Sequence, residues 1–278
     1  MNIGIVGLGL IGASLAKAVT GHTEHRVFGY NRTAEVTRKA LDDGVIFDTL
    51  TDENMSNCEL IFVSIYSNAA IDYVKSKARF FGCDSVVIDC CGTKSCICGE
   101  LWPVAAENSF NFIGGHPMAG LAETGYEASD GELFRGAPMI LTPHPDVNID
   151  SIIWVEKVLK QMGFGEVVYA TPEEHDARIA YTSQLAHILS SAYVMSEKSL
   201  LHSGFSAGSF RDLTRVSWLN ENMWTELFLD NRTHLLSELE GLIMRLTAFR
   251  DAISTGDEQS LRGCLRQGRE RKERVDRL

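Results

Sequence analysis

One stretch of the chain, residues 114–120 (GGHPMAG), places a single imidazole among small and rigid residues. Glycine lets the backbone approach a ligand closely, proline fixes a turn, and His116 is the residue of this stretch that titrates near neutral pH. These residue types suit a histidine that acts as a general base. The alternative is a tight turn whose histidine only hydrogen-bonds the backbone. The elements that position His116 decide between the two.

A glycine-rich loop lies near the start of the chain. The apolar run at residues 3–6 (IGIV) passes into GLGLIG, and a helical pattern follows at residues 14–19. Strand, glycine loop and helix in this order predict dinucleotide binding. The glycines permit a tight turn, close approach to a pyrophosphate and close helix packing. N–H groups at the helix start would bind the phosphates. The residues assigned to the cofactor here are Gly7, Leu8, Gly9, Leu10, Ile11 and Gly12.

The end of the next predicted strand, residues 26–30, is where NAD-binding folds commonly place an acid that binds the ribose. Asn31, Arg32 and Thr33 occupy this place. A carboxylate would repel a 2′-phosphate, whereas an amide, a hydroxyl and a guanidinium can donate to it. The sequence therefore predicts NADP as the cofactor. NAD is the alternative, if Arg32 only stacks on the adenine.

Two further apolar runs, residues 60–65 and 86–89, have the pattern of parallel strands covered on both faces. The loops after them would open at the carboxyl edge of the sheet, where open α/β folds bind ligands. A strand at residues 112–113 would deliver His116 to the same edge, which favours an active-site histidine. The loops contribute the candidates Ser64, Tyr66, Thr93, Lys94 and Ser95.

Residues 171–174 (TPEE) have the pattern of a helix start, with Thr at the N-cap, Pro in the first turn and Glu three residues after the cap. We place the domain boundary there. The predicted fold is an α/β Rossmann-type dinucleotide-binding domain at residues 1–170, followed by an all-α dimerisation domain at 171–278. From Pro172 to about His202 the sequence keeps a helical period and is apolar nearly all round, which predicts burial in a bundle or between subunits, and hence a homodimer. Further helices are expected over residues 222–253 and 257–277.

Composition excludes several classes of protein. A net charge of −11 over 278 residues argues against a general nucleic-acid binder. No export signal fits before the first strand and no run of 18 apolar residues occurs, so we expect a cytoplasmic protein without membrane contact. Seven cysteines are then expected as reduced thiols. Four of them lie at residues 90–98 without paired C-x2-C spacing, so we expect no metal.

Polar groups interrupt the apolar helical half in three places, which are HD at residues 175–176, SQLAH at 183–187 and FRDLTR at 210–215. A buried Arg or His needs a partner, and an anionic ligand would serve. The alternative is pairing within the protein, as between Arg211 and Asp212. For His175 and Asp176 we favour such internal pairing.

Together these motifs resemble the prephenate and arogenate dehydrogenases of tyrosine biosynthesis. The resemblance rests on GLGLIG, GGHPMAG, EEHDARIAYTSQLAH and FRDLTRVS, with Trp224 nine residues after Arg215. It implies oxidative decarboxylation of prephenate to 4-hydroxyphenylpyruvate, with hydride transfer to NADP. It also implies that His116 accepts the proton of the substrate 4-hydroxyl, that Arg215 holds a substrate carboxylate, that His187 is a second pocket histidine and that Gly208 lies in a loop near the substrate. The regulatory and chorismate-mutase segments of some relatives have no room here, so we expect the bare dehydrogenase.

Two positions depart from the family pattern. Relatives often carry Asp-x-Gly-Ser-x-Lys, whose serine assists the histidine; Gly92 stands in its place, and Thr93 or Ser95 could substitute. Gln184 stands where many bacterial members have a histidine. Substrate choice requires a cation for the keto acid prephenate or a carboxylate for the ammonium of arogenate. No clearly unpaired acid occurs in the matched stretches, so we favour prephenate over arogenate. The pocket residues considered there are Lys94, His187 and Gln184.

Two other classes compete with this interpretation. β-Hydroxyacid dehydrogenases and imine reductases share a glycine loop, an Asn-Arg-Thr segment and a helical second domain. They use a lysine on the long helix as the acid, and residues 179–194 contain none. An NADP-sensing binding protein would keep the fold without turnover, and the placement of His116 and Arg215 argues against it.

Overall fold

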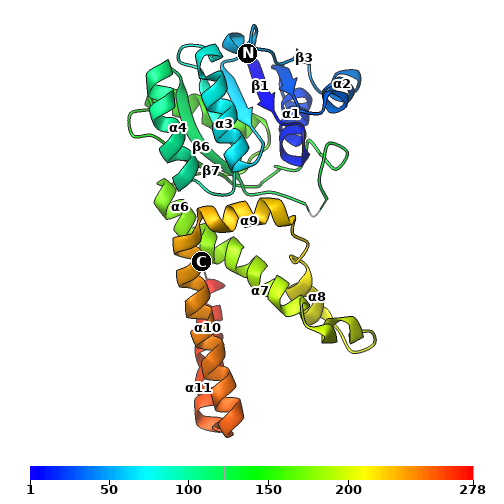
Figure 1. The fold of residues 1–278 in the computed structure, drawn as a ribbon, viewed down its shortest axis with the longest axis vertical. Coiled ribbons are helices and arrows are strands. Elements are labelled where there is room, and N and C mark those ends of the chain that lie inside the picture. The colour runs from blue at the N-terminus through cyan, green and yellow to red at the C-terminus, as the bar shows by residue number, and fades with distance from the viewer. Residues whose placement is uncertain (122, 278) are drawn as a thin grey trace. The chain divides into compact units, whose positions relative to one another are not determined.

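The computed structural model describes residues 1–121 and 123–277, and the chain forms two compact units, residues 1–231 and 232–278 (Figure 1). Leu278, at the end of the predicted helical domain, lies outside the described residues. The first unit contains the α/β part and four α-helices that follow it, and the second is a pair of helices. The predicted domain boundary at residues 170/171 differs from the division between the two compact units at residues 231/232, and it stays a prediction.

An eight-stranded sheet in the order β3-β2-β1-β4-β5-β6-β7-β8 forms the centre of the first unit. Neighbouring strands are parallel, except that β6 and β7 are antiparallel. The chain order reverses at β1, which has β2 on one side and β4 on the other, and ligands bind at such a switch point in open α/β sheets. The strands are β1 (Asn2–Val6), β2 (Arg26–Tyr30), β3 (Asp48–Thr49), β4 (Leu60–Val63), β5 (Val86–Asp89), β6 (Asn111–Pro117), β7 (Met139–Pro143) and β8 (Val167–Tyr169).

Helices cover both faces of this sheet (Figure 1). One apolar cluster joins the sheet to α1 and α5, and a second joins its other face to α3 and α4. Every residue of β4 and β5 is buried, as predicted from their continuous apolar runs. The Rossmann-type α/β fold is thus confirmed. Its helices are α1 (Leu10–His22), α2 (Ala34–Asp42), α3 (Ser67–Lys77), α4 (Ser95–Asn108) and α5 (Ile149–Gln161).

The remainder of the chain is helical, as expected. A capping box formed by Thr171 and Glu174 starts α6, as the sequence predicts. The prediction of a single helix over residues 222–253 is wrong. Asn231 has non-helical backbone angles (φ −106°, ψ 26°) and separates two helices, α9 and α10. The elements are α6 (Pro172–Ile179), the π-helical turn η3 (Ala180–Gln184), α7 (Leu185–Val194), the 3-10 helix η4 (Glu197–Leu201), α8 (Gly208–Thr214), α9 (Glu221–Asp230), α10 (Arg232–Thr255) and α11 (Glu258–Val275).

No helix within the described ranges is long and apolar enough to cross a bilayer. The 3-10 helices η1 (Met55–Asn57) and η2 (Ala78–Phe80) lie between elements of the sheet domain, and the connections that matter for function are the loops at the carboxyl ends of β1, β4, β5 and β6. These loops open toward α6 to α9, which belong to the same compact unit. The sheet edge and these helices together enclose the candidate site.

Candidate active site

A cavity of about 710 Å³ lies between the carboxyl edge of the sheet and the helices α6 to α9. It brings together many residues that the sequence predicted for the site, from segments more than 200 positions apart. Those that line it are Gly9, Leu10, Ile11, Ser64, Tyr66, His116, Gln184, His187 and Arg215. The predicted residues that do not line it are Gly7, Leu8, Gly12, Asn31, Arg32, Thr33, Thr93, Lys94, Ser95 and Gly208.

The glycine loop fits a dinucleotide. Gly7 has φ +88°, and a Cβ there would lie 2.6 Å from the Ser64 carbonyl oxygen. A Cβ on Gly12 would lie 1.8 Å from the Gly7 carbonyl oxygen, so these two glycines are needed for the turn and the packing. A Cβ on Gly9 would meet no atom within 4 Å. The open space at Gly9, the N-cap of α1, is where a pyrophosphate would approach the helix N-terminus.

Asn31 shapes this loop. Its Oδ1 accepts from the backbone N–H of Leu8 at 3.0 Å, and its Nδ2 donates to the Thr33 carbonyl at 3.3 Å. One of the two N–H groups of Nδ2 has no partner among these contacts, so the prediction that Asn31 donates to a 2′-phosphate stays a prediction. Arg32 and Thr33 are exposed at the end of β2.

His116 lies on β6 and contacts a second histidine. Its Nδ1 is 2.9 Å from Nε2 of His175 on α6, and Nδ1 of His175 is 2.7 Å from Oδ1 of Asp176. Burial, the neighbouring His175 ring and Lys94 hold the pKa of His116 well below its usual 6.5. The ring is therefore neutral at pH 7 and can accept a proton.

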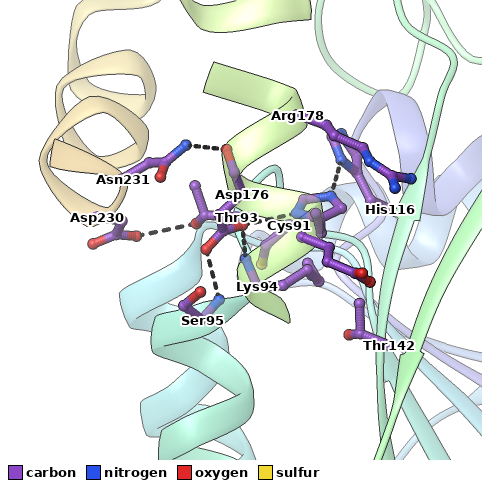
Figure 2. Close-up of polar contacts among 12 residues, drawn as sticks. Cys91, Thr93, Lys94, Ser95, His116, Thr142, Asp176, Arg178, Asp230 and Asn231 are labelled. Atoms are coloured by element: carbon purple, nitrogen blue, oxygen red, sulfur yellow. Dashed lines mark hydrogen bonds and ion pairs between the residues drawn. The ribbon is translucent and has the colours of Figure 1, made fainter. Parts of the chain in front are cut away.

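Asp176 is held by the first turn of α4. Its Oδ1 accepts from the Lys94 N–H at 2.7 Å and its Oδ2 from the Ser95 N–H at 2.8 Å, while its own carbonyl accepts from Asn231 (Figure 2). Burial raises the pKa of Asp176, but the hydrogen bonds from His175, Ser95 and Lys94 outweigh it and the pKa is lowered. The carboxyl group is consequently ionised. Neither His175 nor Asp176 was predicted for the site.

Lys94 forms a fully buried ion pair with Asp89, at the end of β5. Its Nζ also donates to the Gly115 carbonyl at 2.7 Å, and Asp89 Oδ1 accepts from the Gly115 N–H at 3.1 Å. Burial lowers the pKa of Lys94, but the negative charge of Asp89 and weaker effects in the same direction together outweigh it, so the pKa is raised and the amine stays protonated. Lys94, predicted as a catalytic and pocket residue, is thus corrected to a residue that positions the backbone before His116. Its charge is already used inside the protein.

Neither Thr93 nor Ser95, which could substitute for the family serine, lines the cavity. The Thr93 hydroxyl is buried and donates to Asp230 at 3.4 Å, and the exposed Ser95 contributes its backbone N–H (Figure 2). At Gly92 a Cβ would lie 3.2 Å from Leu227 Cδ2, so α9 fills the space beside this position. The Nδ1 of His116 has His175 as its partner instead.

The helices supply the opposite wall of the cavity. His187 donates Nδ1–H to the Val216 carbonyl at 2.8 Å, and its ring centroid is 4.1 Å from that of Trp224. Gln184 is buried, with Nε2 donating to the Leu227 carbonyl at 3.1 Å and Oε1 accepting from Asn231 at 2.8 Å. Because both ends of the amide have partners, its orientation is set.

Arg215 at the end of α8 is exposed and lines the cavity, where its guanidinium can meet a carboxylate. Gly208, at the start of the same helix, does not line the cavity. Two acids outside the matched stretches also line the cavity, Glu123 and Glu226. Glu226 Oε1 accepts from the Asn68 N–H at 2.6 Å.

All seven cysteines are free thiols. Cys90 and Cys91 line the cavity, and burial raises the pKa of Cys90 to about 12. A thiol with so high a pKa is a poor nucleophile and a poor metal ligand at pH 7. In the described part of the chain no three His, Cys, Asp or Glu side chains are placed to hold a metal ion, and the prediction of no metal stays a prediction.

The fold and the glycine loop define a nucleotide-binding protein of the dehydrogenase class. The family described as "Prephenate dehydrogenase, nucleotide-binding domain" matches residues 15–169, and "Prephenate dehydrogenase, dimerization domain" matches residues 171–267. The chain belongs to the prephenate dehydrogenase family, as its motifs predicted. It is an NAD(P)-dependent dehydrogenase by family, with a nicotinamide dinucleotide as cofactor.

Individual relatives agree with this assignment. The chain is 29% identical over 274 residues to the prephenate dehydrogenase of Lactococcus lactis, covering 95% of this chain and 75% of that protein. It is 29% identical over 271 residues to the cyclohexadienyl dehydrogenase of Zymomonas mobilis, covering 92% and 89%. The crystal structure of prephenate dehydrogenase from A. aeolicus in complex with hydroxyphenyl propionate and NAD+ has a TM-score of 0.86 and 26% identity, covering 99% of this chain and 98% of that one.

Proposed function

We propose that this protein converts prephenate to 4-hydroxyphenylpyruvate and CO2, with hydride transfer to NADP. The observation that carries the proposal is His116, a histidine held neutral in a cavity that also contains the glycine loop and Arg215. A neutral imidazole can take the proton of a substrate hydroxyl near pH 7. The nicotinamide ring, when bound, accepts the hydride.

The chain's own residues divide the work as follows. His116 takes the proton of the 4-hydroxyl while the C–H bond on the same carbon breaks and leaves a ketone. Loss of the ring carboxylate as CO2 then sends its electron pair into the ring, and the resulting phenolate regains a proton. Arg215 binds a substrate carboxylate, and His187 and Gln184 line the opposite wall of the cavity. One proton is removed and one returned, so charge balances.

Cofactor binding is assigned to the loop from Gly7 to Gly12, with Ser64 and Tyr66 along the cavity wall. The choice of NADP is supported by the absence of a carboxylate at positions 31–33 and by the exposure of Arg32 and Thr33. A guanidinium there can pair with a 2′-phosphate through two hydrogen bonds. NAD is the competing cofactor.

Arogenate is the competing substrate, and one observation favours it. Glu123 and Glu226 both line the cavity, and a carboxylate can bind the ammonium that arogenate carries in place of the keto group. Glu226 already accepts one backbone hydrogen bond, so Glu123 is the freer of the two for a ligand. Prephenate remains the first choice, because the Lactococcus lactis and A. aeolicus relatives are prephenate dehydrogenases.

The test is a direct assay. The protein is incubated with NADP and prephenate, or with NADP and arogenate, and the absorbance of the reduced cofactor is followed. We expect turnover with prephenate at the higher kcat/KM. A clear preference for arogenate would transfer the assignment to that substrate, and absence of reduction with both would remove the proposed reaction. A 3-hydroxy acid serves as the control for the rival dehydrogenase class.

We also propose a homodimer formed by the helical part. Residues 179–194 are apolar, yet Tyr181, Leu189 and Tyr193 are 36% to 58% exposed in the single chain, and Phe205 beyond them is 94% exposed. Large exposed apolar side chains mark contact surfaces. A second copy is the expected occupant, because the matching family is described as a dimerization domain. Light scattering should give twice the mass of 30.7 kDa, whereas a monomeric mass would contradict the proposal.

A further inference from the structure

We propose that His175 and Asp176 form a relay that keeps the proton of His116 on Nδ1, leaves Nε2 free as the base, and takes up positive charge when His116 is protonated. The proposal rests on the proposed function of His116 as a base. His175 and Asp176 are positioning residues in it, because they act through His116. Two contacts in series carry the argument, from His116 to His175 and from His175 to Asp176.

The first step follows from the hydrogen-bonding inventory of the groups. The ionised Asp176 carboxylate can only accept, and it lies 2.7 Å from His175 Nδ1, which must therefore carry a proton. A neutral His175 then has a bare Nε2, which can only accept. His116 Nδ1, 2.9 Å away, must donate to it. The remaining nitrogen of His116, Nε2, is left without a proton and can act as the base.

The second step concerns what happens after proton uptake. When Nε2 of His116 gains the hydroxyl proton, the ring becomes a cation in a buried place, which is costly without a partner. The Nδ1–H of His116 can pass its proton to Nε2 of His175, so that His116 is neutral again and His175 is the cation. His175 then keeps its Nδ1–H against the Asp176 carboxylate. One proton enters at His116, one crosses to His175, and no other bond changes.

Asp176 is built to stay ionised during this step. It accepts from two backbone N–H groups at the start of α4, which has fourteen residues, and its main-chain carbonyl is held by Asn231. The positive end of a helix stabilises an anion at this position. Gly92 stands at the place of the family serine and has no side chain that could assist His116. Leu227 packs against this position. The charged and titratable groups around His116 are His175 and Asp176 with the exposed Arg178 on α6, the Asp89–Lys94 pair, and Glu123, Glu226 and Arg215 in the cavity.

The closing experiment has one arm that does not depend on activity. Nitrogen-15 NMR of imidazole-labelled protein at pH 7.5 reports which ring nitrogen carries the proton, and His116→Asn and His175→Gln identify the two signals by removing one each. We expect a proton on Nδ1 and a bare Nε2 in both rings. A proton on Nε2 of His116 would overturn the relay even if prephenate is oxidised. Conversely, the expected tautomers without turnover would count against the proposed function alone.

The second arm uses the pH profile of kcat/KM. Two charges on the adjacent rings repel each other, but the relay adds only one proton to the pair, which His175 takes up and the Asp176 carboxylate stabilises. Both side chains therefore favour protonation of the pair, so His175→Gln and Asp176→Asn should each move the acid limb of the profile to lower pH. Both should lower kcat about 10-fold to 1,000-fold, with KM for substrate and cofactor changed less than about 3-fold. His144→Gln is the matched control, because His144 is a partly exposed histidine outside the cavity, and it should change neither kcat nor the acid limb.

The two variants also separate the relay from a purely structural contribution of these residues. A packing defect in α6 would lower kcat or the amount of folded protein while leaving the acid limb in place, and that outcome would overturn the proposal. A shift of the acid limb to higher pH in either variant would also overturn it. If Asp176→Asn folds poorly because α4 loses a cap, the tautomer assignment in the unmodified protein and the His175→Gln profile still decide the question.

Discussion

Lys94 Nζ donates to the Gly115 carbonyl at 2.7 Å, one residue before His116 in the chain, while pairing with Asp89 in full burial. This contact joins the start of α4, the end of β5 and the middle of β6 at one amine. A charge buried in this way is tolerated because its partner is buried with it. The position of His116 therefore depends on a buried ion pair that lies outside the cavity lining.

Removing one member of the Asp89–Lys94 pair should destabilise the folded protein strongly. We expect Lys94→Met to lower the free energy of unfolding by about 3–5 kcal/mol, because Asp89 is left as an unpaired buried charge. Denaturant unfolding gives the value. Lys75→Met is the matched control, since Lys75 pairs with Glu100 at the surface with both side chains about half exposed, and it should cost less than about 1 kcal/mol. The double variant Asp89→Asn/Lys94→Met should lose less than the sum of the two single changes. Simple additivity would mean that the pair is not coupled.

The base is tested by His116→Asn. We expect kcat to fall about 10²-fold to 10⁴-fold, because general-base catalysis is typically worth that much. The Kd for NADP, measured by fluorescence titration, should stay within about 2-fold. The glycine loop at residues 7–12 is assigned to the cofactor, whereas the His116 side chain hydrogen-bonds His175. Turnover close to that of the unmodified enzyme would remove His116 from the mechanism.

Substrate binding is tested by Arg215→Ala. A charge-assisted contact to a carboxylate is worth about 1.5–3 kcal/mol, so KM for prephenate should rise roughly 10-fold to 100-fold. Arg211→Ala is the control, because Arg211 is exposed on the same helix and does not line the cavity. If Arg211→Ala raised KM and Arg215→Ala did not, the carboxylate contact would belong to Arg211.

Cofactor preference is tested at the end of β2. We expect kcat/KM to be at least about 10-fold higher with NADP than with NAD, a difference of about 1.4 kcal/mol. Arg32→Ala should narrow this ratio by raising KM for NADP alone, because only that cofactor carries the 2′-phosphate. Arg38→Ala on the neighbouring helix, also exposed, provides the comparison. An unmodified enzyme that used both cofactors equally well would remove the 2′-phosphate site from this loop.

Stability should depend on pH through the two histidines. Burial lowers the pKa of His116 and of His175 below 6.5, so the unfolded chain binds protons there that the folded protein does not. The free energy of unfolding should therefore decrease as pH falls below 6.5. The carboxyl of Asp176, whose pKa lies below 3.8, loses its contribution only in stronger acid.

Urea unfolding at pH 7.5, 6.5 and 5.5 measures this dependence. In the double variant His116→Asn/His175→Gln the slope between pH 6.5 and 5.5 should become shallower than in the unmodified protein. His144→Gln should leave the slope as it is, because this histidine lies at the surface beside Asp146. An unchanged slope in the double variant would show that other groups account for the loss of stability in acid.

Local sequence determined the parts of this protein that depend on short-range physics. The order of strand, glycine loop and helix at residues 3–19 predicts the nucleotide fold, because only glycine tolerates the φ of Gly7 and the close contact at Gly12. The capping box at Thr171 and the fully buried strands β4 and β5 follow from neighbours in the chain in the same way. His116 was found because its flanking glycines and proline are themselves a local signal.

Tertiary structure decided the contacts that join distant segments. His175 and Asp176 were expected to pair internally, and they do, but only the packing of α6 on the sheet edge brings His175 to His116 from 59 positions away. An adjacent His-Asp pair at the start of a largely apolar helical stretch was the available signal for them. The sequence suggested Lys94 as a cation that is available to a ligand. In the structure Lys94 is buried and forms an ion pair with Asp89. Contacts such as that between His116 and His175 form between residues that are distant in the sequence, so they depend on how the helices pack on the sheet edge.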